Sequence, residues 1–257
     1  MACEVGEKIP LIASQNVFEN VEQFKTLFKA VFFASVASAS VGFSIGYTSY
    51  YNHEDGNIID EIFFAILLAI GAVFGLVFGV IIIERFGRIA GIMIASIFYI
   101  PGWIIIGVCP YGVVIFGRFL TGVATGFCSL TVPIYIVEVS FCRVRGSLMV
   151  INQIGLTIGI LLASILGYLD NKKIIAGAAV TNAVLMRILV QFIPESPRWL
   201  LTKKKRSEAL KALLWLRGPL YDIEDECSYI ENNLGCKQPL IKVGSYCKRK
   251  DKDCRAT

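Results

Sequence analysis

Acidic and basic side chains stand together at three points of the 257-residue sequence, each at the end of a long apolar stretch. The clusters are Glu84/Arg85/Arg88, Glu138/Arg145 and Glu195/Arg198. Opposite charges at the ends of several helices can form an ion-pair network that holds those ends together, and breaking the network lets the helices separate. The three clusters therefore predict a gate. One cluster alone would favour simple anchoring of a helix end at a membrane surface.

Two uncharged amides, Asn152 and Gln153, interrupt another apolar stretch. Amides both donate and accept hydrogen bonds, which suits neutral polyols. Leu156, Thr157 and Ile160 follow Gln153 at i+3, i+4 and i+7, so a helix would place them on the same face. Polar groups inside a membrane span tend to face a cavity or another helix. The residues alone leave both interpretations of Gln153 open, with an interhelical contact the more favoured.

The composition places these side chains in a membrane protein. Hydrophobic residues make up 55% of the chain and charged residues 18%, with a mean hydropathy of +0.64. Soluble domains carry roughly a quarter charged residues. Stretches near the roughly 20 residues needed to cross a bilayer run from Leu27 to Ser49, Ile62 to Ile83, Ile89 to Val108, Gly112 to Val139, Leu148 to Leu169 and Ile174 to Ile193. The sequence thus predicts an all-α membrane protein with six crossings.

The sixth stretch is the least regular because Asn182, Arg187 and Gln191 interrupt it. Arg187 precedes Pro194 by seven residues, which is about 10 Å along a helix. Its long side chain can therefore extend to the near membrane interface. We favour this interpretation over a role in binding a ligand.

Glycines recur at intervals of four in two of the stretches, at Gly71, Gly75 and Gly79 and at Gly122 and Gly126. Small residues at this spacing leave one helix face bare, so that another backbone can lie against it. We therefore expect helices to approach closely at these positions.

The distribution of basic residues predicts the orientation. With the N-terminus in the cytoplasm, the inside loops contain Arg85, Arg88, Arg143, Arg145 and the run from Lys203 to Arg206, whereas the outside loops contain only Lys172 and Lys173. The positive-inside rule thus places both termini in the cytoplasm. Residues 202–257 carry thirteen Lys/Arg and eight Asp/Glu, which accounts for the net charge of +5. The basic excess therefore describes a segment beside a membrane and no nucleic-acid partner.

The chain divides into four predicted segments. Residues 1–26 form a cytoplasmic N-terminal segment, 27–193 the transmembrane bundle, 194–235 a cytoplasmic helical segment and 236–257 a disordered basic tail. In the third segment, apolar residues at helical spacing predict one amphipathic helix around 209–216 and a second over 222–234. Glu7 to Ile12 fits an acidic dileucine sorting pattern, although an unstructured terminus is the simpler interpretation. The predicted location is the plasma membrane or the endosomal or lysosomal membrane.

Catalytic and metal-binding patterns are lacking. The single histidine, His53, lies in a predicted loop, and the eight cysteines contain no C-x-x-C pair. The P-loop pattern G-x-x-x-x-G-K-[ST] does not occur, and no serine or cysteine has a plausible base near it in sequence. We therefore expect no enzyme, no cofactor and no metal site. A pore is a weaker alternative, because no segment resembles a selectivity filter.

Several motifs together resemble those of the sugar porters of the major facilitator superfamily. They are GRFLTGVATG, PIYIVE with RG seven residues after the glutamate, and PESPRWLL. The phrases FCSLTVPIYIVEVS, TIGILLASILG and LRGPLYDIEDEC are most similar to class III facilitative hexose carriers and facilitated trehalose carriers. The resemblance covers about Leu27 to Gly235 and implies a six-helix N-terminal bundle of a major facilitator fold.

The resemblance also implies a mechanism and a substrate. Two six-helix bundles would rock about a central sugar site by alternating access. The residues of the three charged clusters match the positions that latch the cytoplasmic side, and Gln153 matches a glutamine that binds sugar hydroxyls, with Asn152, Leu156, Thr157 and Ile160 beside it. The first span contains no acid, which favours facilitated diffusion over proton coupling.

The sequence departs from the family pattern in its gate and in its length. Glu84 stands where an aspartate is usual, and Cys142 where a proline is usual. The family has twelve spans, of which the chain resembles the first six. We therefore expect an incomplete carrier that needs a second half-carrier, either a copy of itself or another half. The alternatives are a non-transporting half-carrier that regulates a full-length relative, and an inactive truncated product.

Overall fold

The structure is a computed structural model that describes residues 15–54, 58–141, 144–169, 171–217, 227 and 230. Its helices are α1 (Gln15–Glu54), α2 (Ile58–Phe86), α3 (Arg88–Val108), α4 (Tyr111–Val139), α5 (Arg145–Gly167), α6 (Lys172–Val190), α7 (Pro197–Thr202) and α8 (Arg206–Arg217). The first six each contain a segment long and apolar enough to cross a membrane. All regular structure in the described residues is helical, which confirms the predicted fold class.

The helix bounds refine the sequence prediction at both ends of the bundle. α1 continues to Glu54, so His53 belongs to a helix and the prediction of a loop there was wrong. α6 ends at Val190, and a turn leads to Pro194. The dileucine pattern, Arg143, the basic tail and, apart from Cys227 and Ile230, the second amphipathic helix lie outside the described residues.

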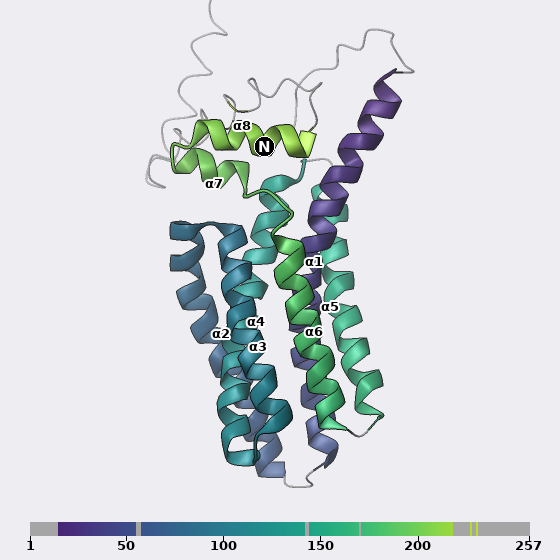
Figure 1. Cartoon of the computed structure of the whole chain (residues 1–257), viewed down its shortest axis with the longest axis vertical. Helices are drawn as coiled ribbons and strands as arrows, with labels where there is room; N and C mark the ends of the chain where they lie inside the picture. Colours follow the sequence, from purple (N-terminus) through teal and green to yellow (C-terminus); the bar gives the residue numbers. More distant parts are fainter. Residues whose placement is uncertain are drawn as a thin grey trace, which may run out of the picture.

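Helices α1 and α4 form the centre of the bundle. α1 packs most extensively against α5 and also contacts α4 and α6, while α4 packs against α2 and α3. Aromatic side chains fill the space between these groups, with the Trp103 ring 5.5 Å from Phe43 and 5.2 Å from Tyr47, measured between ring centroids. Side-chain amides add polar contacts, since Asn182 Nδ2 donates to Ser40 Oγ at 2.9 Å. The six long helices therefore form one packed unit (Figure 1).

The predicted close approach of helices at the glycines is confirmed. A Cβ atom added to Gly75 of α2 would overlap the backbone of Val123 in α4, and one added to Gly126 would overlap the backbone of Ala72 in α2. The pair α1 and α5 is equally tight, because a Cβ at Gly42 would overlap the carbonyl group of Leu156. Backbone atoms meet backbone atoms at these crossings, so the helices cannot accommodate a larger residue without separating.

Helices α7 and α8 lie across one end of the bundle, which we call the α7–α8 end (Figure 1). Ser196 accepts a hydrogen bond from the Trp199 N–H and so caps α7. Helix α8 buries the face that contains Ala209, Leu213 and Leu216. Thr26 Oγ1 donates to the Leu216 carbonyl at 3.4 Å, which ties the end of α8 to α1. The two short helices are therefore attached to the bundle by specific contacts.

Candidate functional site

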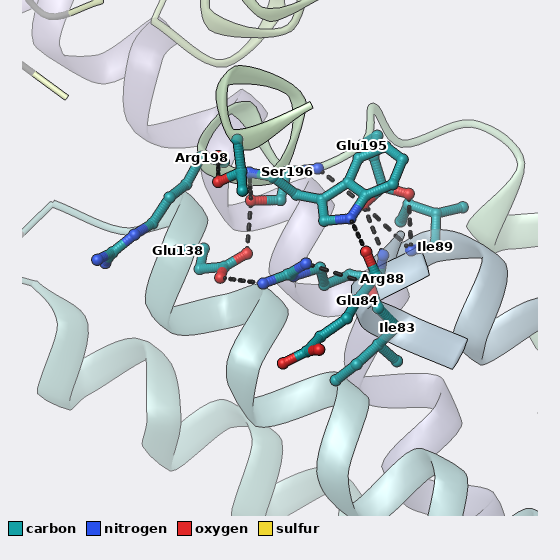
Figure 2. A network of polar contacts seen from close by, with 10 residues as sticks. Ile83, Glu84, Arg88, Ile89, Glu138, Glu195, Ser196 and Arg198 are labelled. Carbon is teal, nitrogen blue, oxygen red and sulfur yellow. Dashed lines mark hydrogen bonds and ion pairs between the residues drawn. The ribbon is translucent and has the colours of Figure 1, made fainter. Parts of the chain in front are cut away.

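An ion pair joins the start of α3 to the last turn of α4 at the α7–α8 end. Arg88 Nη2 lies 2.7 Å from Glu138 Oε1, and the two side chains are 15% and 9% exposed (Figure 2). Arg88 Nη1 also donates to the carbonyl oxygen of Ile83 at 3.2 Å. Side chains this little exposed keep the ion pair largely out of water, so removal of one partner would leave the other as a poorly solvated charge. The contact therefore joins the two helix ends directly.

The segment between α6 and α7 is bound to the same carboxylate. Ser196 Oγ donates to Glu138 Oε2 at 2.6 Å, so each oxygen of Glu138 has its own partner (Figure 2). Two residues earlier in the segment, the Pro194 carbonyl accepts from the Tyr135 hydroxyl at 3.0 Å. Glu138 thus connects three parts of the chain: α3, α4 and the segment that leads into α7.

Glu195 caps the N-terminus of α3. Its Oε1 accepts from the Arg88 N–H at 2.9 Å, and its Oε2 accepts from the Ile89 N–H at 3.1 Å (Figure 2). Gly87, just before the helix, has a φ of 106°, and a Cβ there would overlap the carboxylate. Only glycine adopts this conformation without strain and leaves the space. A carboxylate at a helix N-terminus also complements the helix dipole.

Burial raises the pKa of Glu195 above its ordinary value, because the charged form is poorly solvated there. Hydrogen bonds from the Ser196, Arg88 and Ile89 N–H groups, and the charge of Arg88, act in the opposite direction without cancelling the effect of burial. Keeping the Glu195 carboxylate ionised at the N-terminus of α3 therefore costs free energy of solvation.

Residues of one charged cluster contact residues of another cluster in the structure, although they are far apart in the sequence. Arg88, Glu138 and Glu195 come together, whereas Arg145 forms no ion pair in the described structure. Arg198 is exposed and points away from Glu195 (Figure 2). Contacts across the network therefore run between clusters and not within them.

The remaining cluster residues, Glu84 and Arg85, have exposed side chains. Glu84 contributes its backbone, since its carbonyl accepts from Trp199 Nε1 at 3.0 Å. Arg85 lies over the Phe86 ring, 5.8 Å from its centroid. Ser196 and Trp199 were missed as contact residues by sequence reasoning, although both stand inside the PESPRWLL motif.

A pocket of about 700 Å³ opens beside the network. Pro133, Ile134 and Val137 of α4 form its apolar part, and Trp199 of α7 contributes to its lining. Its charged lining residues are Glu84, Arg88, Glu138, Arg198 and Lys203. The ion pair therefore lies at a recessed surface that another segment of protein could enter.

The structure separates the candidate ligand residues of α5. Asn152 Oδ1 accepts a hydrogen bond from Ser38 of α1, so this amide is used between helices. Gln153 and Thr157 are exposed on α5, whereas Leu156 and Ile160 are half-buried with their backbones against Gly42 of α1. Gln153 and Thr157 thus present polar groups on a face that no other described helix covers.

Two arginines within the spans have partners that the sequence did not indicate. Arg187 Nη1 donates to the Met93 carbonyl of α3 at 3.2 Å. Arg118 of α4 is fully buried and donates to the Ser44 carbonyl at 3.0 Å and to the Thr48 hydroxyl of α1. The sequence analysis did not identify Arg118 as a candidate site residue. It could have been found as a charged residue inside an apolar stretch, because such residues mark structural or functional sites in membrane proteins.

A bundle of six helices long and apolar enough to cross a membrane, with a charged network at one end, is the architecture of a polytopic membrane protein. Residues 26–238 match the family model described as "Sugar (and other) transporter". The chain therefore belongs to this sugar transporter family.

Curated relatives carry sugar transport names. Facilitated trehalose transporter Tret1 of Drosophila mojavensis is 37% identical over 146 residues, covering 56% of this chain and 17% of that protein. Sugar transporter ERD6-like 8 of Arabidopsis thaliana is 35% identical over 158 residues, covering 61% of this chain and 34% of that protein. The galactose-proton symporter of Escherichia coli is 33% identical over 159 residues, covering 60% and 34%. The chain spans about a third of the length of the first curated relatives it matches.

Solved structures share the fold. The major facilitator superfamily proton:xylose symporter XylE, bound to 6-bromo-6-deoxy-D-glucose, superimposes with a TM-score of 0.70 at 21% identity, covering 84% of this chain and 54% of that chain. The partially occluded inward-open form of XylE from E. coli gives a TM-score of 0.67 at 22% identity, covering 83% and 59%. At this identity the likeness establishes the architecture of the bundle.

Proposed function

We propose that the chain provides the N-terminal six-helix half of a sugar carrier that works by facilitated diffusion with alternating access. The observation that carries this proposal is the Arg88–Glu138 ion pair, held at 2.7 Å beside Ser196 and Glu195 at one end of a bundle of the sugar transporter family. In this proposal the α7–α8 end faces the cytoplasm, and the network is the gate that closes it.

The remaining charged residues belong to the same gate in this proposal. Arg145, Arg198, Glu84 and Arg85 form no ion pair in the described structure. Arg198 and Glu84 line the pocket beside the network. We propose that a second six-helix bundle enters this pocket and supplies opposite charges, so that the full gate forms between two halves.

The substrate is a neutral sugar, either a hexose or trehalose, that contacts α5. Gln153 and Thr157 are exposed on this helix, and their polar groups can pair with sugar hydroxyls. Leu156 and Ile160 provide apolar surface beside them, while Asn152 keeps α5 in register with α1 through Ser38. Buried polar groups in a membrane are costly when unpaired, which supports a partner bundle over this face.

Facilitated diffusion is supported by the distribution of acids. In the six candidate spans the only Asp or Glu residues are Glu84 and Glu138, both at the α7–α8 end. The middle of the bundle thus offers no carboxyl group in the described residues to carry a proton. We therefore propose that uptake follows the sugar gradient alone.

The experiment reconstitutes the chain into proteoliposomes, alone and together with a separately expressed C-terminal half of Tret1 from Anopheles gambiae. Uptake of radiolabelled glucose and trehalose should be saturable only with both halves and insensitive to a protonophore. Gln153→Ala should raise KM about tenfold, since one hydrogen bond contributes about 1 to 1.5 kcal/mol. Thr181→Ala, an exposed position on α6, is the matched control and should leave KM unchanged.

Saturable uptake by the chain alone would contradict the half-carrier proposal, and protonophore-sensitive uptake would contradict facilitated diffusion. Stable association of the two halves without uptake would favour the second candidate, a half-carrier that regulates a full-length relative. The recessed charged pocket is the observation that favours this candidate, because it suits a partner surface whether or not sugar crosses.

A further inference from the structure

Arg217, the last residue of α8, contacts the end of α4, from which it is distant in sequence. Its Nη1 donates to the Val139 carbonyl at 3.2 Å, and its guanidinium carbon lies 3.6 Å from the centroid of the Phe141 ring. The residue is only 4% exposed. Arg217 is thus a buried charge placed on the C-terminal end of a membrane helix.

The contact has a clear physical cause. The last carbonyls of a helix have no partner within it, and they form the negative end of the helix dipole. A guanidinium supplies both the donors and the opposite charge, and its flat shape stacks on an aromatic ring. A buried charge is costly without such compensation, and the end of α4 supplies part of it for Arg217.

The turn that Arg217 holds contains the central acid of the gate. Glu138 immediately precedes Val139 in the last turn of α4, and its two oxygens bind Arg88 and Ser196. On the other side, the Phe141 carbonyl accepts from the Arg145 N–H at 3.0 Å and starts the turn into α5. A shift of this turn would therefore move Glu138 away from both partners.

The end of α8 is itself fixed to the bundle. The Leu216 carbonyl accepts from Thr26 Oγ1 of α1, and the Leu216 side chain is fully buried. Adjacent residues of α8 thus contact α1 and α4. Arg217 therefore links α8 to the last turn of α4.

We propose that Arg217 is a positioning residue of the gate, which holds the last turn of α4 in the orientation where Glu138 reaches both Arg88 and Ser196. The proposal rests on the proposed function of that network as a gate. Loss of Arg217 should therefore open the α7–α8 end in the same way as loss of the Glu138 charge.

The test measures how fast the pocket beside Glu138 becomes accessible. The full chain carrying Ile134→Cys is reconstituted in liposomes and labelled with a thiol reagent, and modification is followed on the peptide that contains position 134. Glu138→Gln, Arg217→Met and their combination are compared on this background, together with thermal unfolding of each variant. Arg187→Met is the matched control, because Arg187 also donates Nη1 to a carbonyl at 3.2 Å but lies on the α3–α6 contact.

We expect Glu138→Gln and Arg217→Met each to raise the labelling rate at least threefold, and the double variant to be no faster than either. Arg217→Lys should restore part of the wild-type rate, since it keeps the charge but not the stacking. Arg187→Met should leave the rate unchanged. A lower unfolding temperature for Arg217→Met with an unchanged labelling rate would overturn the proposal and make Arg217 a purely structural residue.

The gate and the positioning role fail in distinguishable ways. If Glu138→Gln itself leaves the labelling rate unchanged, the gate proposal fails, and Arg217 is then judged by unfolding temperatures in the double-mutant cycle. If the change in unfolding temperature of the double variant differs from the sum of the changes in the two single variants, the positioning role is supported. If the changes are additive, it is refuted. If Arg217→Met does not fold, Arg217→Lys takes its place in the same cycle.

Discussion

Two arginines in the bundle are held in opposite ways. Arg118, in its interior, is fully buried, and its described partners are neutral: the Ser44 carbonyl, the Thr48 hydroxyl and the Phe64 ring, whose centroid is 4.5 Å away. Arg88, at the α7–α8 end, is 15% exposed and faces a carboxylate at 2.7 Å. The described partners of Arg118 thus provide dipoles and an aromatic face, whereas the partner of Arg88 provides a full opposite charge.

The same contrast applies to the packing around each arginine. In the interior, helices touch backbone to backbone at glycines such as Gly75 and Gly126. At the α7–α8 end, the helix ends are joined through side chains such as Arg88 and Glu138. We therefore expect the tightly packed interior to move less than the α7–α8 end during a change of conformation.

Replacing each arginine by lysine tests this contrast, and it has the largest expected effect on the free energy of unfolding. Arg118→Lys should lower the free energy of unfolding by about 3 kcal/mol, because an ammonium cannot bond Ser44 and Thr48 together while stacking on Phe64. Arg88→Lys should cost about 1 kcal/mol, because lysine can keep the ion pair with Glu138 and loses mainly the hydrogen bond to the Ile83 carbonyl. Unfolding of both variants in bicelles provides the measurement. Equal losses at the two sites would break the comparison.

Two glycines of the same helix test the interior packing with a smaller effect. Gly75→Ala should cost about 2 kcal/mol, because its Cβ meets backbone atoms of α4 that cannot move aside. Gly79→Ala is the control, since its Cβ would meet only side-chain atoms of Leu130 and Phe127, at 3.3 and 3.4 Å. Thermal unfolding should separate the two variants by several degrees. A tolerated Gly75→Ala would show that the interior is loosely packed.

The third test concerns the α7–α8 end and measures how Glu195 makes the stability of the protein depend on pH, which is the smallest of the three expected effects. Because burial raises the pKa of Glu195, its contribution to stability is fully present below the ordinary value of 4.5 and is lost as the pH rises through the raised value. Glu195→Gln should remove this dependence, so the wild type should gain stability relative to the variant on acidification from pH 7.5 to 4.5. Unfolding temperatures across this range are the measurement, with the exposed Glu208→Gln as control. A wild type that loses stability relative to Glu195→Gln in acid would contradict the expected sign.

Much of the fold could be predicted because the relevant signals are local in sequence. The lengths of the apolar stretches predicted the six spans. The four-residue spacing of Gly71 and Gly75, and of Gly122 and Gly126, predicted a close approach of helices. The identity of that crossing, α2 with α4, could not be read from either stretch alone. The loop predicted around His53 was wrong because α1 continues through polar residues that hydropathy assigns to water.

The candidate site was predicted as a set of residues but not as a set of contacts. Which acid meets which base depends on how far each helix is rotated about its axis and where it crosses its neighbours. Glu138 therefore pairs with Arg88 and not with Arg145, although Arg145 is nearer in the sequence. Glu195 was predicted as a member of the ion-pair network, and the structure shows that it caps α3 by accepting from backbone N–H groups. Arg118 was overlooked because its partners, a carbonyl and a hydroxyl, leave no charge pattern in the sequence.

Gly87 alone separates α2 from α3. Both helices are long and apolar enough to cross a membrane, and a single residue between them leaves no loop that could extend into water. The corner made by Glu84, Arg85 and Arg88 must therefore lie at a membrane surface, where charged side chains stay hydrated. Insertion of residues between Phe86 and Arg88 would accordingly loosen the hairpin and move Arg88 relative to Glu84.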